Sequence, residues 1–147
     1  VDLETLQRGL GDSARFDLFE LPATALSGQT QRAVRMLRGM LAEGQPEPLI
    51  LWALGRDGRA LAQGALRCSR GEPVAVVAKG FRGTDATALR QALGRIGPAA
   101  ARDLLTRAAI VDRVIKGREP GNAGRQLIDL VIALSDPPAP RMEKRSA

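Results

Sequence analysis

Apolar residues recur at helical spacing along much of this chain, most clearly over residues 97–117. One stripe is formed by Leu104, Ala108, Val111 and Ile115. Steps of three and four residues place these side chains on one face of an α-helix. Pro98 suits the first helical position, and Gly117 can take the left-handed conformation that closes a helix. Two acid-first pairs at a spacing of four, Asp103 with Arg107 and Asp112 with Lys116, add helical support.

Similar periodicity predicts helices elsewhere, joined by short connections. The expected ranges are 2–10, 23–26, 29–43, 49–66, 85–96 and 127–135. The apolar cluster 16–21, which ends at Pro22, is interpreted as a hinge, because proline disfavours a helix interior. Val74–Ala78 has strand-like composition, but a lone strand has nothing to pair with, so a short helix is preferred. The pattern predicts an all-α helical bundle of about six helices.

The helix over 49–66 contains two interior glycines, Gly55 and Gly58. Each costs about 1 kcal/mol relative to alanine unless it lets a neighbouring helix approach closely. We therefore expect close packing at this helix. Arg56, Asp57 and Arg59 lie between the apolar positions, where they either face solvent or contact another subunit.

The residues missing from the sequence exclude several kinds of chemistry. The chain of 147 residues has no histidine, one cysteine, and neither a GxxxxGK[ST] nor a GxGxxG motif. A Ser-His-Asp triad, a Cys-based metal cluster and the two common phosphate-binding loops therefore cannot be built from it. We expect no enzyme, cofactor or metal site. The lone Cys68 fits a reducing compartment such as the cytoplasm, and no apolar run is long enough to span a membrane.

The net charge is +6 and is carried almost entirely by arginine, which permits binding to nucleic acid or to an acidic partner. On the predicted helix 29–43, Arg32, Arg35 and Arg38 lie beside the apolar face. Aromatic residues make up only 3% of the chain, so the stacking platforms of single-strand binding are nearly absent. A basic helical module that binds nucleic acid directly therefore remains the alternative function.

Three segments, in this order, resemble the C-terminal part of the delta subunit of bacterial DNA polymerase III, a component of the sliding-clamp loader. They are GDSARFDLFEL at 11–21, the run QRAVRMLRGMLAEGQPEPLILWALGRDGRAL at 31–61, and IVDRVIKG at 110–117. The resemblance covers nearly the whole chain. It implies the end of a lid domain at 1–12, a connecting segment at 13–28 and a helical collar domain at 29–135. The proline and charge content of 136–147 predicts a disordered tail.

The family's collars pack into a ring that holds the loader together, so the resemblance implies a non-catalytic assembly domain in the bacterial cytoplasm. The implied partners are the gamma/tau and delta-prime subunits, and the sliding clamp through an N-terminal domain that this chain lacks. Contact with DNA would be indirect. The first residue is Val and the chain opens inside a predicted helix, so we expect it to be part of a longer protein.

Five charged residues are the candidate subunit-interface residues: Arg56, Arg59, Asp112, Arg113 and Lys116. They match recurrent helix and turn positions of the family. Gly58 and Gly124 depart from it, because the family often has a bulky apolar residue at the first position and a Trp at the second. Reversing the charges at Asp112, Arg113 and Lys116 is expected to weaken assembly more than folding.

Overall fold

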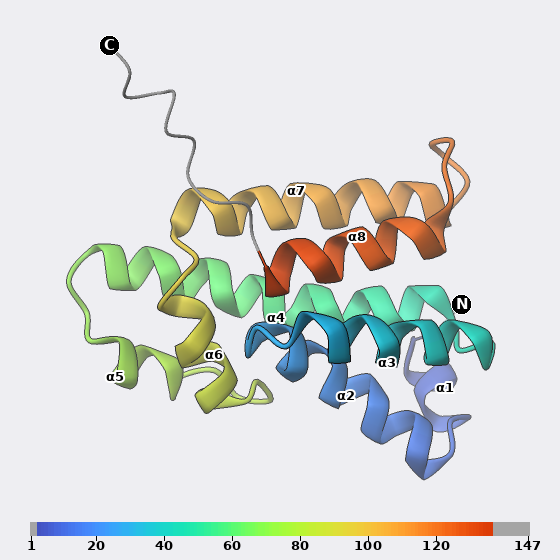
Figure 1. The fold of residues 1–147 in the computed structure, drawn as a ribbon, viewed down its shortest axis with the longest axis horizontal. Helices are drawn as coiled ribbons and strands as arrows, with labels where there is room; N and C mark the ends of the chain where they lie inside the picture. The colour runs from blue at the N-terminus through green and yellow to red at the C-terminus, as the bar shows by residue number, and fades with distance from the viewer. Residues whose placement is uncertain (1–2, 137–147) are drawn as a thin grey trace.

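The computed structural model describes residues 3–136, and this part of the chain contains eight α-helices and no strand (Figure 1). The predicted all-helical fold class is therefore confirmed. The helices are α1 (Leu3–Arg8), α2 (Asp12–Leu26), α3 (Thr30–Ala42), α4 (Glu47–Ser69), α5 (Val74–Ala78), α6 (Ala86–Leu93), α7 (Pro98–Ile115) and α8 (Ala123–Ser135).

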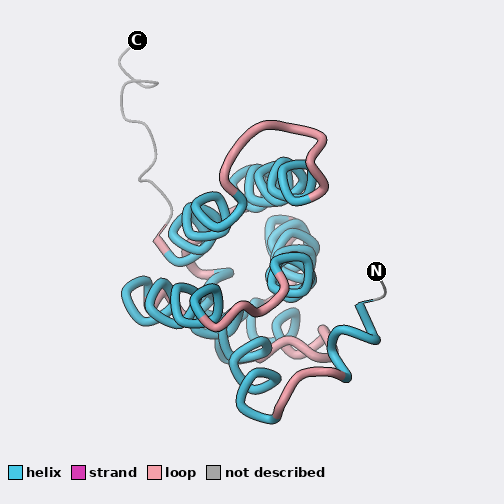
Figure 2. Tube along the Cα trace, turned by 90° about the vertical axis from the view of Figure 1, so that its right-hand side faces the viewer, coloured by secondary structure: helices cyan, strands magenta, loops and turns pink. Residues whose placement is uncertain are grey.

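Helix α4 is the central element, since α1, α2, α5, α6, α7 and α8 all pack against it. Helices α7 and α8 form a pair above α3 and α4, while α1 and α2 lie below (Figure 1). Helices α3, α4, α7 and α8 are seen nearly end-on in Figure 2. Helices α5 and α6 pack together beside the C-terminal half of α4. The arrangement gives one shared core.

The largest fully buried side chains come from helices that are distant in the sequence. Examples are Leu18 and Leu21 of α2, Leu37 of α3, Leu61 of α4 and Leu89 of α6, each 0% exposed. Burying a leucine fully contributes about 1.5–3 kcal/mol, so these contacts hold helices that would be marginal alone.

Helix α7 matches the sequence prediction at both ends. Pro98 occupies its first position, and Gly117 has φ +74° after its last turn. The amide of Gly117 donates to the carbonyl of Val114, which satisfies one of the unpaired carbonyls at the helix end. The predicted Asp112–Lys116 ion pair forms, with Oδ2 and Nζ 2.9 Å apart. The Asp103–Arg107 pair does not form within 4.0 Å.

The hinge predicted at residues 16–21 is wrong, because α2 continues through Pro22 to Leu26. Proline removes one backbone hydrogen bond and costs about 3 kcal/mol inside a helix. Leu18, Leu21 and Leu26 lie at near-helical spacing and are fully buried. Their burial outweighs the cost of the proline, so packing decides the conformation of this segment.

The short connections behave largely as expected. Val74–Ala78 is helical, and the Asp85 side chain caps α6 by accepting a hydrogen bond from the amide of Ala88 at 2.9 Å. Residues 80–83 form turns, with Gly83 at φ +85°. The tail predicted at 136–147 lies outside the described residues except for Asp136, which follows α8.

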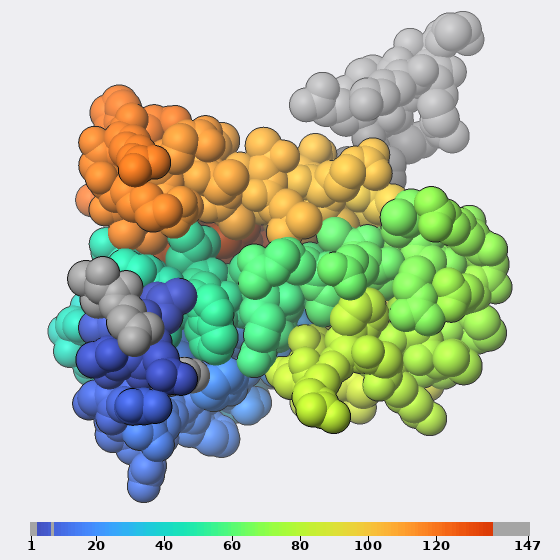
Figure 3. Space-filling model, turned by 180° about the vertical axis from the view of Figure 1, so that it is seen from behind, coloured from blue at the N-terminus to red at the C-terminus, as the bar shows by residue number. Residues whose placement is uncertain are grey.

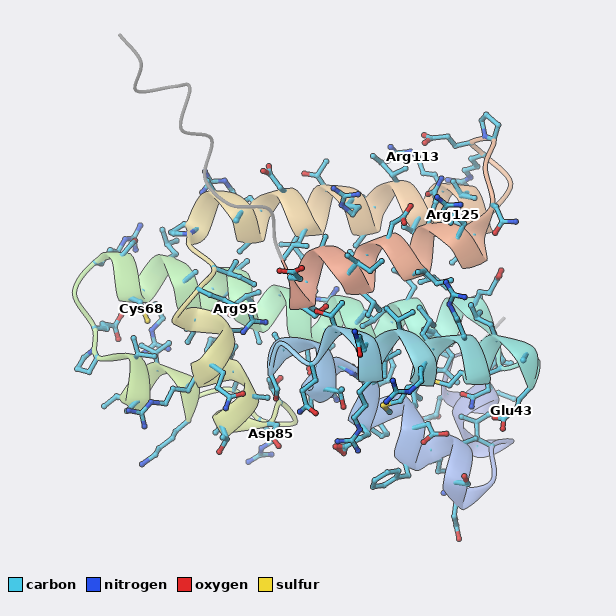
Figure 4. The ribbon with its side chains drawn as sticks, in the orientation of Figure 1. Glu43, Cys68, Asp85, Arg95, Arg113 and Arg125 are labelled. Atoms are coloured by element: carbon cyan, nitrogen blue, oxygen red, sulfur yellow. The ribbon has the colours of Figure 1, made fainter. Side chains whose placement is uncertain are left out.

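Arg95, in the connection from α6 to α7, joins the C-terminal ends of two helices (Figure 4). Its guanidinium donates hydrogen bonds of 3.2 Å to the carbonyls of Ala25 in α2 and Leu134 in α8. A cation suits both positions because helix C-termini carry partial negative charge. Arg95 thus ties α2 and α8 together.

Candidate interaction surface

Helix α4 places Gly58 at its crossing with α7. A Cβ atom at Gly58 would lie 3.4 Å from Cδ2 of Leu105 in α7, which is ordinary van der Waals contact. The close packing expected at Gly58 therefore does not require a glycine. At Gly55 the nearest atom to such a Cβ belongs to Arg59 of the same helix, at 3.3 Å.

An open groove of about 600 Å³ follows this crossing on the face shared by α1, α4 and α7 (Figure 3). We call it the α4–α7 groove. Its apolar lining consists of Leu3, Pro48, Leu51, Trp52, Gly55, Leu105, Ala108 and Ala109. Three charged residues complete it: Arg59, Asp112 and Lys116. The groove thus combines an apolar floor with a charged rim.

The charged rim comes from two helices that are far apart in the sequence. Arg59 is exposed on α4 and makes no ion pair within the described part of the chain. Lys116 and Asp112 pair with each other one turn apart at the end of α7. Such an exposed pair contributes little to folding, about 0.3–0.5 kcal/mol, so the rim charges remain available to a partner.

Arg56, the fourth predicted residue, lies outside the groove lining and belongs to an aromatic cluster. Its guanidinium carbon is 5.2 Å from the ring centroid of Phe19 and 5.6 Å from that of Trp52. The two rings meet edge to face at 6.2 Å. Cation–π contacts of this kind contribute about 0.5–1 kcal/mol at exposed sites, so Arg56 helps to fix α2 against α4.

Arg113, the fifth predicted residue, also lies outside the groove. Its Nε is 3.1 Å from Oε1 of Glu119, in the loop between α7 and α8 (Figure 4). The structure thus brings together three of the five predicted residues and separates the other two. Residues 112 and 113 are about 100° apart around the helix axis, and the ion pair with Glu119 holds Arg113 toward the α7–α8 loop.

The sequence prediction for Asp57 was wrong, because this side chain is not on the surface. Asp57 is 1% exposed and accepts hydrogen bonds from Thr84 Oγ1 at 3.0 Å and from Arg56 Nε at 3.2 Å. Burial raises the pKa of Asp57, while Arg56 and Thr84 act in the opposite direction. The sequence does contain a signal for this burial. Asp57 lies three residues after Leu54 and four before Leu61, on the same helix face as these buried leucines.

The aromatic residues of α2 were missed as surface features. Phe16 is 63% exposed and Phe19 is 38% exposed, and both line a shallow depression with Asp12, Glu20 and Gly83. Phe19 also contacts Trp52 of α4, so its exposed ring lies beside α4. Exposed apolar side chains of this size often mark contacts with other proteins.

No known protein-family model, curated protein or solved structure matches this chain. Within residues 3–136, no helix is both long and apolar enough to cross a membrane. The same residues contain no cluster of three potential metal ligands. The fold and the surfaces described above therefore carry the functional argument.

Proposed function

We propose that this chain is an assembly domain of the delta subunit of a bacterial DNA polymerase III clamp loader, acting without catalysis of its own. The α4–α7 groove is the observation that carries the proposal. It joins Arg59, Asp112 and Lys116, three of the residues expected at a subunit interface, to an apolar floor. The resemblance of three sequence segments to the delta family supplies the identity of the complex.

The composition of the groove suits a protein partner. Interfaces are enriched in aromatic residues and arginine, and their best-packed parts are apolar with charges at the rim. Trp52 and Arg59 line the groove, and its floor includes Leu51, Leu105 and Ala108. A helix from a neighbouring loader subunit could bind in this groove, because an amphipathic helix places its apolar residues in a groove and its polar residues at the edge.

In this proposal the neighbours are the gamma/tau and delta-prime subunits, and assembly allows the sliding clamp to be opened and loaded on primed DNA in the bacterial cytoplasm. The sliding clamp itself would be contacted through a separate N-terminal domain. The test is size-exclusion chromatography of the full chain mixed with the gamma and delta-prime subunits at low salt. Co-elution is expected. Separate elution at micromolar concentrations would exclude the proposal.

Direct nucleic-acid binding remains the second candidate, and the arginines of α3 favour it. Arg32, Arg35 and Arg38 are exposed and make no ion pair in the described part of the chain. A titration of labelled primer–template DNA tests this candidate. Tight binding that weakens steeply with salt would support it, because each phosphate contact releases counterions.

A further inference from the structure

Helix α3 presents a row of positive charge that forms no ion pair with the acidic residues of the described range 3–136. Arg32, Arg35 and Arg38 are exposed, and the helix itself contains no Asp or Glu. Elsewhere, ion pairs within the chain hold several cations, such as Arg8, Arg67 and Arg125. None of the three α3 arginines has a carboxylate within 4.0 Å among residues 3–136. Their charge is therefore available to a binding partner.

Two of these arginines, Arg35 and Arg38, border a second groove, between α3 and α8. It has a volume of about 400 Å³ and is lined by Thr30, Gln31, Val34, Arg35, Arg38 and Ile132. Its apolar floor includes Ile132, which is 39% exposed although its neighbours Leu130, Val131 and Leu134 in α8 are buried. Helices α3 and α8 lie side by side at the front of the molecule (Figures 1 and 4), whereas the α4–α7 groove faces the back (Figure 3).

We propose that the α3–α8 groove binds an acidic amphipathic helix of a partner protein. Arg35 and Arg38 are one helical turn apart, a rise of about 4.5 Å. Carboxylates three or four residues apart on a partner helix have nearly the same spacing, so both can pair with the arginines. An apolar side chain between those carboxylates would lie on Val34 and Ile132.

The mixed character of the groove favours a protein over nucleic acid. A phosphate backbone offers no apolar group for Val34 and Ile132 to contact, whereas an amphipathic helix does. Stacking platforms for unpaired bases are mainly aromatic, and the exposed Phe16 and Phe19 belong to α2, outside the groove lining. An acidic amphipathic helix can pair with the arginines and pack on the apolar side chains of the same surface.

The test is a titration of the full chain with a synthetic helical peptide that has leucines along one face and glutamates on both sides of it. A peptide of the same composition in shuffled order is the control ligand, and oligothymidylate and a DNA duplex are the nucleic-acid probes. Fluorescence anisotropy measures affinity, and amide chemical shifts locate the site. We expect the amphipathic peptide to bind about tenfold more tightly than the shuffled one.

Two double variants with the same net charge separate the groove from general electrostatic attraction. Arg35→Glu/Arg38→Glu should weaken peptide binding at least about tenfold, while Arg82→Glu/Arg90→Glu, at exposed positions outside the groove, should change it by less than about threefold. If Arg35→Glu/Arg38→Glu melts at a lower temperature than the wild type, Arg35→Gln/Arg38→Gln replaces it. Ile132→Ala should lower the affinity for the amphipathic peptide and leave the affinity for the shuffled peptide unchanged.

Three results would overturn the proposal. The first is equal affinity for the two peptides, because it would show attraction by charge alone. The second is equal weakening by the two double variants. The third is tighter binding of either nucleic acid through Arg35 and Arg38, which would assign the groove to phosphate recognition instead.

Discussion

At the scale of single residues, two charged side chains, the exposed Arg95 and the buried Asp57, connect elements that are distant in the sequence. Arg95 donates to the carbonyls of Ala25 and Leu134, and Asp57 joins α4 to the loop before α6 through Thr84. Neither contact follows from sequence spacing, because the partners are 27 to 70 residues away along the chain. Both are interactions that form only when the helices pack.

Replacing Arg95 with alanine should lower the free energy of unfolding by about 1–2 kcal/mol, because two helix C-terminal carbonyls lose a charged donor. Urea unfolding followed by circular dichroism measures the change. Arg90→Ala is the matched control, since Arg90 is exposed on α6 and forms no ion pair in the described residues. Equal stability of the two variants would contradict the assigned role of Arg95.

Asp57 should make stability depend on pH in a defined direction. Its pKa in the folded protein is raised above the ordinary value of 3.8, so folding takes up a proton between the two values. The contribution of Asp57 to the free energy of unfolding therefore falls as pH rises through that window. Asp57→Asn should remove this dependence while keeping an acceptor for Thr84.

The measurement for Asp57 is the free energy of unfolding from pH 3.8 upward for the wild type and the Asn variant. Other carboxylates titrate in both proteins, so their effects cancel in the difference. The difference should shift in favour of the Asn variant as pH rises. A difference that is constant with pH would show that Asp57 titrates normally.

At the scale of helices, the sequence predicted those elements whose signals are local. Helix α7 has Pro98 at its start and Gly117 beyond its end, and both caps are as expected. Helix α2 was predicted incorrectly, because Pro22 is a strong local signal and the burial of Leu18 and Leu21 is not visible locally. Where tertiary packing outweighs a local signal, sequence pattern alone gives the wrong boundary.

The candidate site was also predictable only where its features are local in the sequence. The Asp112–Lys116 pair follows from a spacing of four residues, and its formation is confirmed. That Arg59 lines the same groove depends on how α4 crosses α7, which no spacing within one helix specifies. The aromatic contacts of Arg56 likewise require α2 to lie against α4.

Two of the three buried glycines of α4, Gly58 and Gly64, should respond differently to alanine, because their surroundings differ. A Cβ at Gly58 would meet one atom, at 3.4 Å, on the half-buried Leu105. A Cβ at Gly64 would meet Leu93 and Val77, both at 3.3 Å. Gly58→Ala should raise the free energy of unfolding by about 0.5–1 kcal/mol through helix propensity.

At Gly64 the same gain in helix propensity is opposed by contact with two neighbouring side chains, so Gly64→Ala should be neutral or destabilising. Chemical denaturation of both variants under identical conditions gives the comparison. The opposite order of stabilities would mean that the α4–α7 contact, not the α4–α5–α6 contact, is the tighter one.

At the scale of the whole molecule, the two grooves lie on different faces of one bundle (Figures 1 and 3). The α4–α7 groove carries both signs of charge around an apolar floor, which suits a specific subunit contact. The α3–α8 groove has only positive charge on its rim, which suits an acidic partner. A domain with both could contact two proteins at the same time.

The most direct measurement is the affinity of the full chain for the gamma and delta-prime subunits with the groove charges reversed. Arg59→Glu/Lys116→Glu changes two groove residues, and Arg82→Glu/Arg90→Glu changes two exposed arginines outside it by the same charge. We predict that the first variant binds at least about tenfold more weakly, while the control stays within about threefold and both melt like the wild type. Equal affinities for the two variants would contradict assembly through the α4–α7 groove.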